Sequence, residues 1–219
     1  MSKPILDRLT SVDTNSVSDA LDILGLAGAT YGLGPLWGCG KIVGRASTIQ
    51  LAARTDAKQT THVIAPVIET ISTEDRVLVI AGGLHGISSW GDILANAAKF
   101  RQVRGSVIDG MSRDIDGSEQ IAYPVFGRGV TMISGRNRVM QVSSGTPIMM
   151  AGVEVREDDY VIADRCGTVF ICAERVVEIV TLAEMIVAEQ DKLIHAIGDG
   201  LPLSQLIRTT EFNKVAAYP

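Results

Sequence analysis

Along the chain, segments in which apolar residues recur at helical spacing alternate with short apolar runs typical of strands. From Asp13 to Leu24, apolar residues recur at helical spacing behind the cap-type residues Asp13 and Thr14, and Gly25 comes next. This pattern predicts an amphipathic helix that ends at the glycine. Further helices are predicted over 60–71, 93–104 and 174–197.

Short runs rich in β-branched and other apolar residues lie between these helices. The run 76–81 is almost wholly apolar and ends at Gly82 and Gly83, which is typical of a buried strand. Strands that alternate with helices predict an α/β fold, and neither a repeat nor a low-complexity linker divides the chain. We therefore expect one domain over 1–219. Other strands are predicted over 42–52, 105–109, 123–126, 140–142, 146–150, 160–163 and 168–172.

Composition and charge narrow the function classes. The 219 residues are 46% hydrophobic and carry a net charge of −5, which predicts a packed core and disfavours nucleic-acid binding. The longest uncharged run, 23–40, holds six glycines and Pro35, so it predicts loops rather than a membrane span. Three cysteines without metal-type spacing indicate free thiols and a cytoplasmic location, and three scattered histidines disfavour a His-rich zinc site.

The first candidate for chemistry follows the strand 76–81. A glycine-rich loop leads from this strand into a helix that begins between Ser89 and Asp92. A helix N-terminus presents unpaired N–H groups and a positive dipole end, which suits a carboxylate or a phosphate. The alternative is an ordinary strand–loop–helix connection. The segment has neither the dinucleotide fingerprint nor the P-loop ending.

The second candidate follows the next predicted strand, 105–109. Asp109, Arg113, Asp114 and Asp116 lie within eight residues, and such charges are costly to bury without partners. They can surround a hard divalent cation such as Mg²⁺, with Arg113 binding an anionic substrate. The alternative is a solvated Arg–Asp cluster that caps the next turn.

These two segments together carry a family resemblance. Asp92 is followed after 20 residues by Arg113 and Asp114, within Trp-Gly-Asp-Ile-Leu at 90–94 and Gly-Ser-Val-Ile-Asp-Gly at 105–110. The segments 18–21 and 123–129 fit as well. From about Ser16 to about Gly198 the chain resembles the 4-hydroxy-4-methyl-2-oxoglutarate / 4-carboxy-4-hydroxy-2-oxoadipate aldolases, which share a fold with the ribonuclease E activity regulators.

The resemblance implies a class II pyruvate aldolase, a lyase that uses Mg²⁺, Mn²⁺ or another divalent cation and has oxaloacetate decarboxylase side activity. It makes Asp114 the metal ligand and places Arg113 on the pyruvyl carbonyl or enolate oxygen. Asp92 would help to hold a metal-bound or catalytic water. The pyruvyl carboxylate would bind the backbone amides of Gly91, Asp92, Ile93 and Leu94. His85 is either a further substrate contact or a structural residue.

The resemblance also implies a layered α/β sandwich related to the swivelling phosphohistidine domains. It predicts a homotrimer or homohexamer with sites between subunits and with either Glu189 or Asp191 reaching the neighbour's site. The tail 200–219 has no clear pattern of its own, and we expect it to pack on a neighbouring subunit. The segment 164–168 departs from the family pattern, which leaves the natural 2-oxo acid open.

Two other functions stay open at this point. One is a non-catalytic regulator of a ribonuclease E-type partner, and the other is a metal-dependent lyase or hydratase for a different 2-oxo acid. No nucleic-acid or membrane partner is expected. Neither motif holds a suitable lysine, which argues against a Schiff-base aldolase.

Overall fold

The computed structural model of the chain describes residues 4–55 and 63–209. Its helices are α1 (Ile5–Ser11), α2 (Thr14–Ile23), α3 (Ala65–Thr70), α4 (Asp92–Phe100), α5 (Ile115–Gln120), α6 (Val176–Gly198) and α7 (Leu203–Thr209). Its strands are β1 (Gly34–Pro35), β2 (Ile42–Ala53), β3 (Arg76–Ala81), β4 (Ser88–Trp90), β5 (Ser106–Ser112), β6 (Val125–Val130), β7 (Val139–Ser144), β8 (Ile148–Met150), β9 (Val153–Val155), β10 (Tyr160–Asp164) and β11 (Gly167–Ile171).

One mixed sheet organises the fold. Its strand order is β1-β6-β5-β3-β2-β10-β11, with β4 added beside β5 and β7 beside β2. The strands β2, β3, β5 and β6 run parallel, whereas β10 and β11 form an antiparallel hairpin on β2. The segment before β1 joins the other end of the sheet, because Phe170 N donates to Gly28 O at 2.9 Å and Thr30 N donates to Thr168 O at 3.2 Å. The sheet is therefore curled into a nearly closed barrel.

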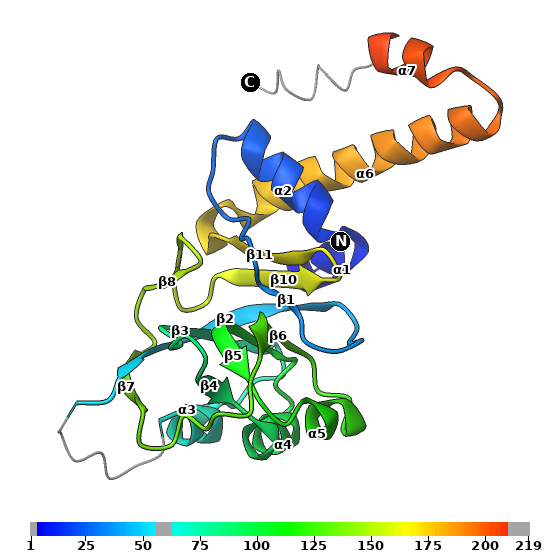
Figure 1. Cartoon of the computed structure of the whole chain (residues 1–219). Helices are drawn as coiled ribbons and strands as arrows, with labels where there is room; N and C mark the ends of the chain where they lie inside the picture. Colours follow the sequence, from blue (N-terminus) through cyan, green and yellow to red (C-terminus); the bar gives the residue numbers. More distant parts are fainter. Residues whose placement is uncertain (1–3, 56–62, 210–219) are drawn as a thin grey trace.

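Alternation along the buried strands divides the core. In β3, Val77 and Val79 belong to the cluster inside the curled sheet, while Leu78 and Ile80 belong to the cluster beneath α3 and α4. A third cluster joins α1, α2 and α6 to β10 and β11. Figure 1 shows these two groups of helices on opposite sides of the sheet. The predicted α/β class is confirmed, and the relation to phosphohistidine domains stays a prediction.

The caps predicted for the first long helix are present. Asp13 Oδ1 accepts from the backbone N of Ser16 at 2.7 Å, which satisfies one free N–H of α2. At the other end, Gly25 takes φ +64° and Leu26 N donates to Leu21 O at 2.9 Å. A glycine in this left-handed position closes the last turn without a Cβ penalty.

Asp13→Ala is expected to lower the free energy of unfolding by about 1 kcal/mol at neutral pH, because α2 loses its N-cap. Burial raises the pKa of the Asp13 carboxyl, but the Ser16 hydrogen bonds and the Lys41 charge outweigh burial and leave this pKa below 3.8. The stabilising effect is therefore present above the ordinary carboxyl pKa and is lost as the pH falls through the folded-state pKa. Urea unfolding at several pH values tests this, with Asp13→Asn as the cap-preserving control.

Several boundaries differ from the predictions. The strand predicted over 105–109 extends to Ser112, so Arg113 follows it directly. The loop after β3 contains the short strand β4, which has too few residues for a period to be recognised. The helix predicted over 60–71 is seen at Ala65–Thr70, with Pro66 in its first turn, and residues 60–62 lie outside the described residues. The short helices α1 and α5 were not predicted.

The helix α6 contacts α1, near the start of the chain, through an ion pair. Arg8 Nε and Nη2 donate to the two carboxylate oxygens of Glu184 at 2.9 and 2.7 Å. The last buried residue of α6 is Ile186, and beyond it the helix extends away from the barrel (Figure 1). This outer part leaves Ile194 and Ile197 exposed. Among the described residues, no helix combines the length and the apolarity that a membrane crossing requires.

Candidate functional site

A pocket of about 340 Å³ lies where the ends of β4 and β5 meet the segment between β6 and β7. All six residues predicted from the paired motif line this pocket. They are Gly91, Asp92, Ile93, Leu94, Arg113 and Asp114.

Parallel pairing of β4 with β5 brings the two motifs together. Ser88 lies opposite Met111 and Trp90 opposite Ser112, so the residues that follow both strands emerge at the same edge. The backbone N of Arg113 donates to Trp90 O at 3.0 Å, which fixes the two strand ends to each other. The Trp90 ring is 2% exposed and stacks on Tyr123 with ring centroids 6.1 Å apart. The site therefore rests on a buried aromatic support.

The N-terminus of α4 opens into the pocket. Its first intrahelical bond runs from Ala95 N to Gly91 O, so the N–H groups of the preceding residues lie outside the helical ladder. The cap residue is a glycine, which brings no side chain between these groups and a ligand. The nine-residue helix adds the positive end of its dipole. This arrangement suits a carboxylate.

Arg113 and Asp114 form an ion pair at the pocket wall. Arg113 Nε lies 3.0 Å from Asp114 Oδ2, and the two side chains are 34% and 36% exposed. Asp114 adopts the left-handed conformation (φ +55°, ψ +41°) and does not cap α5 with its side chain. Non-glycine residues rarely take this conformation, and such strain is concentrated at functional sites. The carboxylate faces Arg113 instead of its own helix.

Two glycines leave room for the acidic side chains. A Cβ at Gly91 would lie 2.8 Å from Asp114 Oδ2, and a Cβ at Gly117 would lie 2.8 Å from the Cβ of Asp92. Gly91 has an extended backbone, so its role here is steric and not conformational. The glycines let α4, α5 and the Arg113–Asp114 pair approach closely enough to share one pocket.

Other predicted residues lie elsewhere. Asp109 pairs with Arg128 and accepts the backbone N of Ala151 at 2.7 Å, so it stabilises the sheet and does not line the pocket. Asp116 is exposed on α5. His85 is exposed in the loop before β4 and is not among the described residues that line the pocket, so its contact with substrate stays a prediction.

The two acidic residues proposed to reach a neighbouring subunit lie on the outer part of α6. Glu189 binds Lys192 at 3.1 Å on its own helix, and Asp191 is exposed. Their reach into another subunit stays a prediction, as does the packing of the tail.

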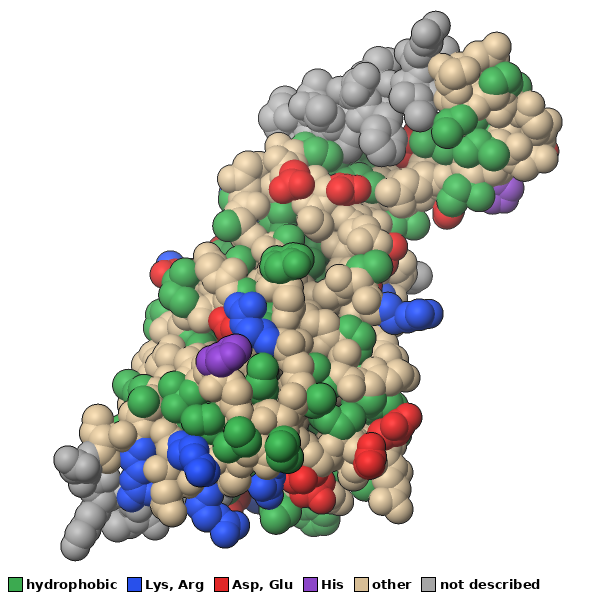
Figure 2. Space-filling model, viewed as in Figure 1, with side chains coloured by type: hydrophobic (Ala, Val, Ile, Leu, Met, Phe, Trp, Pro, Cys, Tyr) green, Lys and Arg blue, Asp and Glu red, His purple; other side chains and the backbone are tan. Residues whose placement is uncertain are grey.

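Part of the pocket was missed by the sequence analysis. Arg54 follows β2, and Ser134, Gly135, Arg136 and Asn137 form the turn before β7. These positions belong to neither motif, so they were not among the predicted site residues. Figure 2 shows Lys and Arg side chains gathered at this end of the molecule, beside the grey segment.

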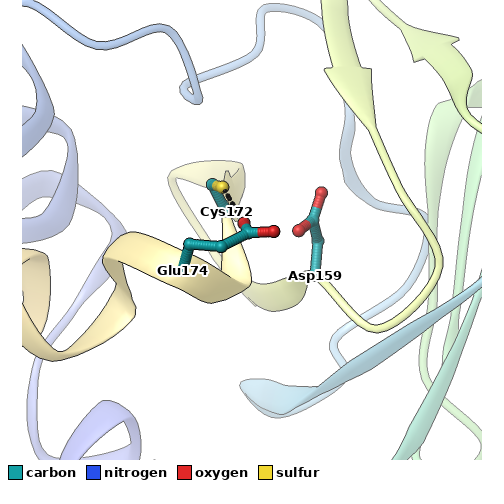
Figure 3. Close-up of side chains that lie close together, drawn as sticks. All are labelled: Asp159, Cys172 and Glu174. Atoms are coloured by element: carbon teal, nitrogen blue, oxygen red, sulfur yellow. Dashed lines mark hydrogen bonds between the residues drawn. The ribbon is translucent and has the colours of Figure 1, made fainter.

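A second acidic cluster could hold a metal ion, and it lies apart from the residues that line the pocket. Figure 3 shows Asp159, Cys172 and Glu174 facing one another at the start of β10 and the end of β11. Asp159 is buried, which raises its pKa, and its oxygens accept the backbone N of Arg156 at 2.7 Å and of Ala173 at 3.0 Å.

The cysteine of this cluster is held as a neutral thiol. The Cys172 thiol donates to Glu174 at 2.5 Å, and this bond, with burial, raises the thiol pKa. Asp159 fixes local turns and Cys172 bonds Glu174, whereas a hard cation prefers oxygen donors to a thiol, and the Asp114 carboxylate offers such donors in the pocket.

Comparisons with known proteins place the chain in a family. The family model described as "RraA-like: Aldolase/RraA" matches residues 14–170. Protein DlpA of Legionella pneumophila is 30% identical over 92% of the chain, which spans 33% of that longer protein. A Halalkalibacterium halodurans protein named "Putative 4-hydroxy-4-methyl-2-oxoglutarate aldolase" is 28% identical over 92% of the chain and 93% of its own length.

Solved structures agree on the fold. An uncharacterized protein from Pseudomonas syringae has a TM-score of 0.81 and 30% identity, with 94% of this chain and 97% of that chain covered. RraAS2 of Streptomyces coelicolor, titled an unusual member of the RNase ES inhibitor RraA protein family, has a TM-score of 0.75 and 23% identity over 89% and 98% of the two chains. The chain thus belongs to the RraA-like family of aldolases and RraA proteins.

Proposed function

We propose that the protein is a divalent-metal-dependent pyruvate aldolase. It cleaves a 4-hydroxy-2-oxo acid, such as 4-hydroxy-4-methyl-2-oxoglutarate or 4-carboxy-4-hydroxy-2-oxoadipate, and releases pyruvate. The observation that carries this proposal is the meeting of the α4 N-terminus, Arg113 and two carboxylates in one pocket. The relative named as an aldolase and the Aldolase/RraA family match support it.

Asp114 fits the metal that such a reaction needs. Its carboxylate is partly exposed in the pocket and turned away from α5, and the described lining residues include neither histidine nor cysteine. Oxygen donors of this kind match Mg²⁺ or Mn²⁺. When bound, the ion supplies a Lewis acid that polarises the C2 carbonyl of the substrate.

The chain's own residues perform the remaining tasks. The N–H groups at the start of α4 bind the pyruvyl carboxylate and orient the substrate. Asp92, through a water, accepts the proton of the C4 hydroxyl as the C3–C4 bond breaks and its electrons move to the C2 carbonyl. Arg113 stabilises the negative charge that develops on the C2 oxygen of the pyruvate enolate. C4 leaves as the carbonyl carbon of the second product, and the proton held by Asp92 and its water returns to C3 of the enolate to give pyruvate.

The same enolate explains a side activity. Loss of CO₂ from oxaloacetate leaves a pyruvate enolate, so the same groups would support oxaloacetate decarboxylation. No lysine is among the described residues that line the pocket, which agrees with a metal-dependent mechanism rather than a Schiff base.

A pyruvate-release assay over 4-hydroxy-2-oxo acids and oxaloacetate, with and without Mg²⁺ or Mn²⁺, tests the proposal. We expect metal-dependent pyruvate release from at least one 4-hydroxy-2-oxo acid. Release of no pyruvate from the whole panel, together with no Mg²⁺ binding in a titration, would favour the second candidate, a regulator of a ribonuclease E-type partner. That candidate draws on the Aldolase/RraA family match and on the likeness in fold to RraAS2, a member of the RNase ES inhibitor RraA protein family.

Gly91→Ala is expected to lower kcat/KM by about tenfold or more and to weaken metal binding, because the new methyl group displaces Asp114 and crowds Arg113. The displaced atoms are side-chain ends, so the thermal unfolding midpoint should change little. Gly38→Ala is the control, since a Cβ at Gly38 meets no atom within 4 Å. Equal metal affinity and turnover in both variants would show that the Asp114 position is unimportant.

We further propose a cytoplasmic trimer or hexamer. The cysteines Cys39, Cys166 and Cys172 are free thiols, as a reducing compartment favours. The exposed apolar residues on the outer part of α6 and beyond, such as Ile194 and Leu201, give subunits a surface to share.

A further inference from the structure

A second pocket, of about 400 Å³, is bounded by α3, β7 and the parallel strands β2 and β3. The elements α3 and β7 lie toward the lower left in Figure 1. None of its described lining residues also lines the pocket of Arg113 and Asp114. Its volume is within the range of sites that bind small molecules, and the proposed function makes no use of it. The chemistry of its walls therefore indicates which ligand it would take.

The residues that line the second pocket carry no net charge. Arg76 and Glu157 are the only charged side chains among its described lining residues. Arg76 Nη1 lies 3.4 Å from Glu157 Oε1, so the two charges compensate each other. A site that selects an anion or a cation presents an excess of the opposite charge, and this lining does not. We therefore expect a neutral ligand.

Glu157 has one carboxylate oxygen with room for a closer partner. Its Oε2 accepts the backbone N of Thr48 at 2.7 Å, which fixes the carboxylate. Its Oε1 receives only long contacts, at 3.4 Å from Ser47 Oγ and 3.4 Å from Arg76 Nη1. Ser47 and Thr48 are 5% and 0% exposed, so they form a buried floor. A ligand hydroxyl that donates to Oε1 would make the short hydrogen bond that the protein does not supply.

Arg76 is a fixed donor beside this acceptor. Its Nη1 donates to Ala46 O at 3.1 Å and lies 2.6 Å from Asp158 Oδ1. Asp158 also binds Arg45 at 3.1 Å, and neither of these two residues lines the pocket. The contacts of Arg76 with described residues use Nη1 and Nε, which leaves the N–H groups of Nη2 for a ligand. The pocket thus holds a donor and an acceptor next to each other.

Uncharged polar groups and apolar groups complete the lining. The side chains of Ser72, Gln141 and Ser144 make no hydrogen bond with any described residue. Pro66 and Val67 of α3 add apolar surface to the same pocket. Hydroxyl and amide groups both donate and accept, so they match a ligand whose own groups do the same.

Two neighbouring hydroxyl groups of one ligand fit this arrangement. One would donate to Glu157 Oε1, the next would accept from Arg76 Nη2, and the carbon skeleton would contact the apolar residues of α3. We propose that the second pocket binds a small neutral polyol, such as a monosaccharide, through a vicinal pair of hydroxyl groups. This site goes beyond the proposed function and does not depend on it.

A pair of diols tests the hydroxyl spacing. The probes trans-cyclohexane-1,2-diol and cis-cyclohexane-1,3-diol share the ring and the number of hydroxyl groups, and only the first has neighbouring hydroxyls. Titrations followed by protein NMR chemical shifts should show at least about fivefold tighter binding of the 1,2-diol. D-Glucose, which has several vicinal pairs, should bind at least as tightly as the 1,2-diol. Equal affinity for both diols, or binding of none of these probes, would refute the proposal.

Variants assign the diol to this pocket. Glu157→Gln should weaken binding of the 1,2-diol by about tenfold, because the charged acceptor is lost while the amide oxygen can still accept from Thr48 N. Gln141→Ala removes a lining amide that makes no hydrogen bond with a described residue, so it should weaken D-glucose binding and keep the native unfolding temperature. Glu154→Gln is the matched control, since Glu154 is an exposed carboxylate that does not line the pocket, and it should keep the native affinity.

The same titrations show whether the diol binds instead in the pocket of Arg113. Arg113→Ala should bind the 1,2-diol and D-glucose as the native protein does, whatever the outcome of the pyruvate-release assay. Loss of diol binding in Arg113→Ala would refute the second site. Native affinity in both Glu157→Gln and Gln141→Ala would refute it as well.

Discussion

Excess EDTA is expected to abolish pyruvate release, and added Mg²⁺ or Mn²⁺ to restore it. The proposed protein ligand is a single carboxylate, Asp114, on a partly exposed pocket wall. Hard cations held by few protein ligands bind weakly and exchange with solution, so a chelator should remove the ion. The measurement is initial rate against free metal concentration after chelation. Full activity in excess chelator would contradict the proposed mechanism.

Variants at the two acidic sites show which of them binds the metal ion that activity requires. Asp114→Asn should raise the Mg²⁺ concentration needed for half-maximal activity by about tenfold or more, because the site loses its charged ligand. Cys172→Ser with Glu174→Gln should leave that concentration unchanged, since these residues do not line the pocket. If only the second variant changed the Mg²⁺ concentration for half-maximal activity, the catalytic metal would be assigned to the cluster of Asp159, Cys172 and Glu174.

Arg113→Ala and Arg113→Lys are expected to lower kcat by about 10²–10³-fold. The guanidinium would contact the C2 oxygen more strongly when that oxygen carries charge, so its loss affects turnover more than substrate binding. Lysine keeps the charge but loses the planar fork, so it should not restore the rate. Coupled assays of pyruvate release give kcat and KM, and oxalate, an enolate mimic, should inhibit the variants less than the native enzyme.

Stability measurements separate this role from a scaffold role. The Arg113–Asp114 pair is more than one-third exposed at Asp114, and pairs of this kind contribute little to stability. Both variants should therefore unfold near the native temperature. Arg128→Ala is the control, because it removes the partner of Asp109 outside the pocket and should leave kcat near the native value. If Arg113→Ala lowered the unfolding temperature and kept kcat within a few-fold of the native value, the Arg113–Asp114 pair would have a structural role and not a catalytic one.

The sequence predicted the part of the site that two local patterns encode. Each motif follows an apolar strand, and parallel strands place their carboxyl ends at one edge, so the meeting of Asp92 with Arg113 and Asp114 could be expected. The left-handed conformation of Asp114 could not, because no local sequence pattern marks a non-glycine residue for this conformation.

Two arginines that line the pocket, Arg54 and Arg136, could not be predicted from the sequence for a different reason. They are far apart in the chain, and their segments lie side by side because β7 pairs with β2. No local period encodes that antiparallel pairing. The same holds for the closure of the sheet, where the segment at Ala29 bridges to Val169.

The contact of α1 and α2 with α6 has a consequence for how the chain folds during synthesis. Leu9 and Leu21 are buried against residues of α6, and Arg8 bonds Glu184 across 176 positions. Until the ribosome has released most of the chain, α1 and α2 lack the residues of β10, β11 and α6 that cover most of their apolar face. Folding should therefore be slow and completed late, as in other domains dominated by non-local contacts. A nascent chain stalled before α6 would expose this apolar face and depend on chaperones.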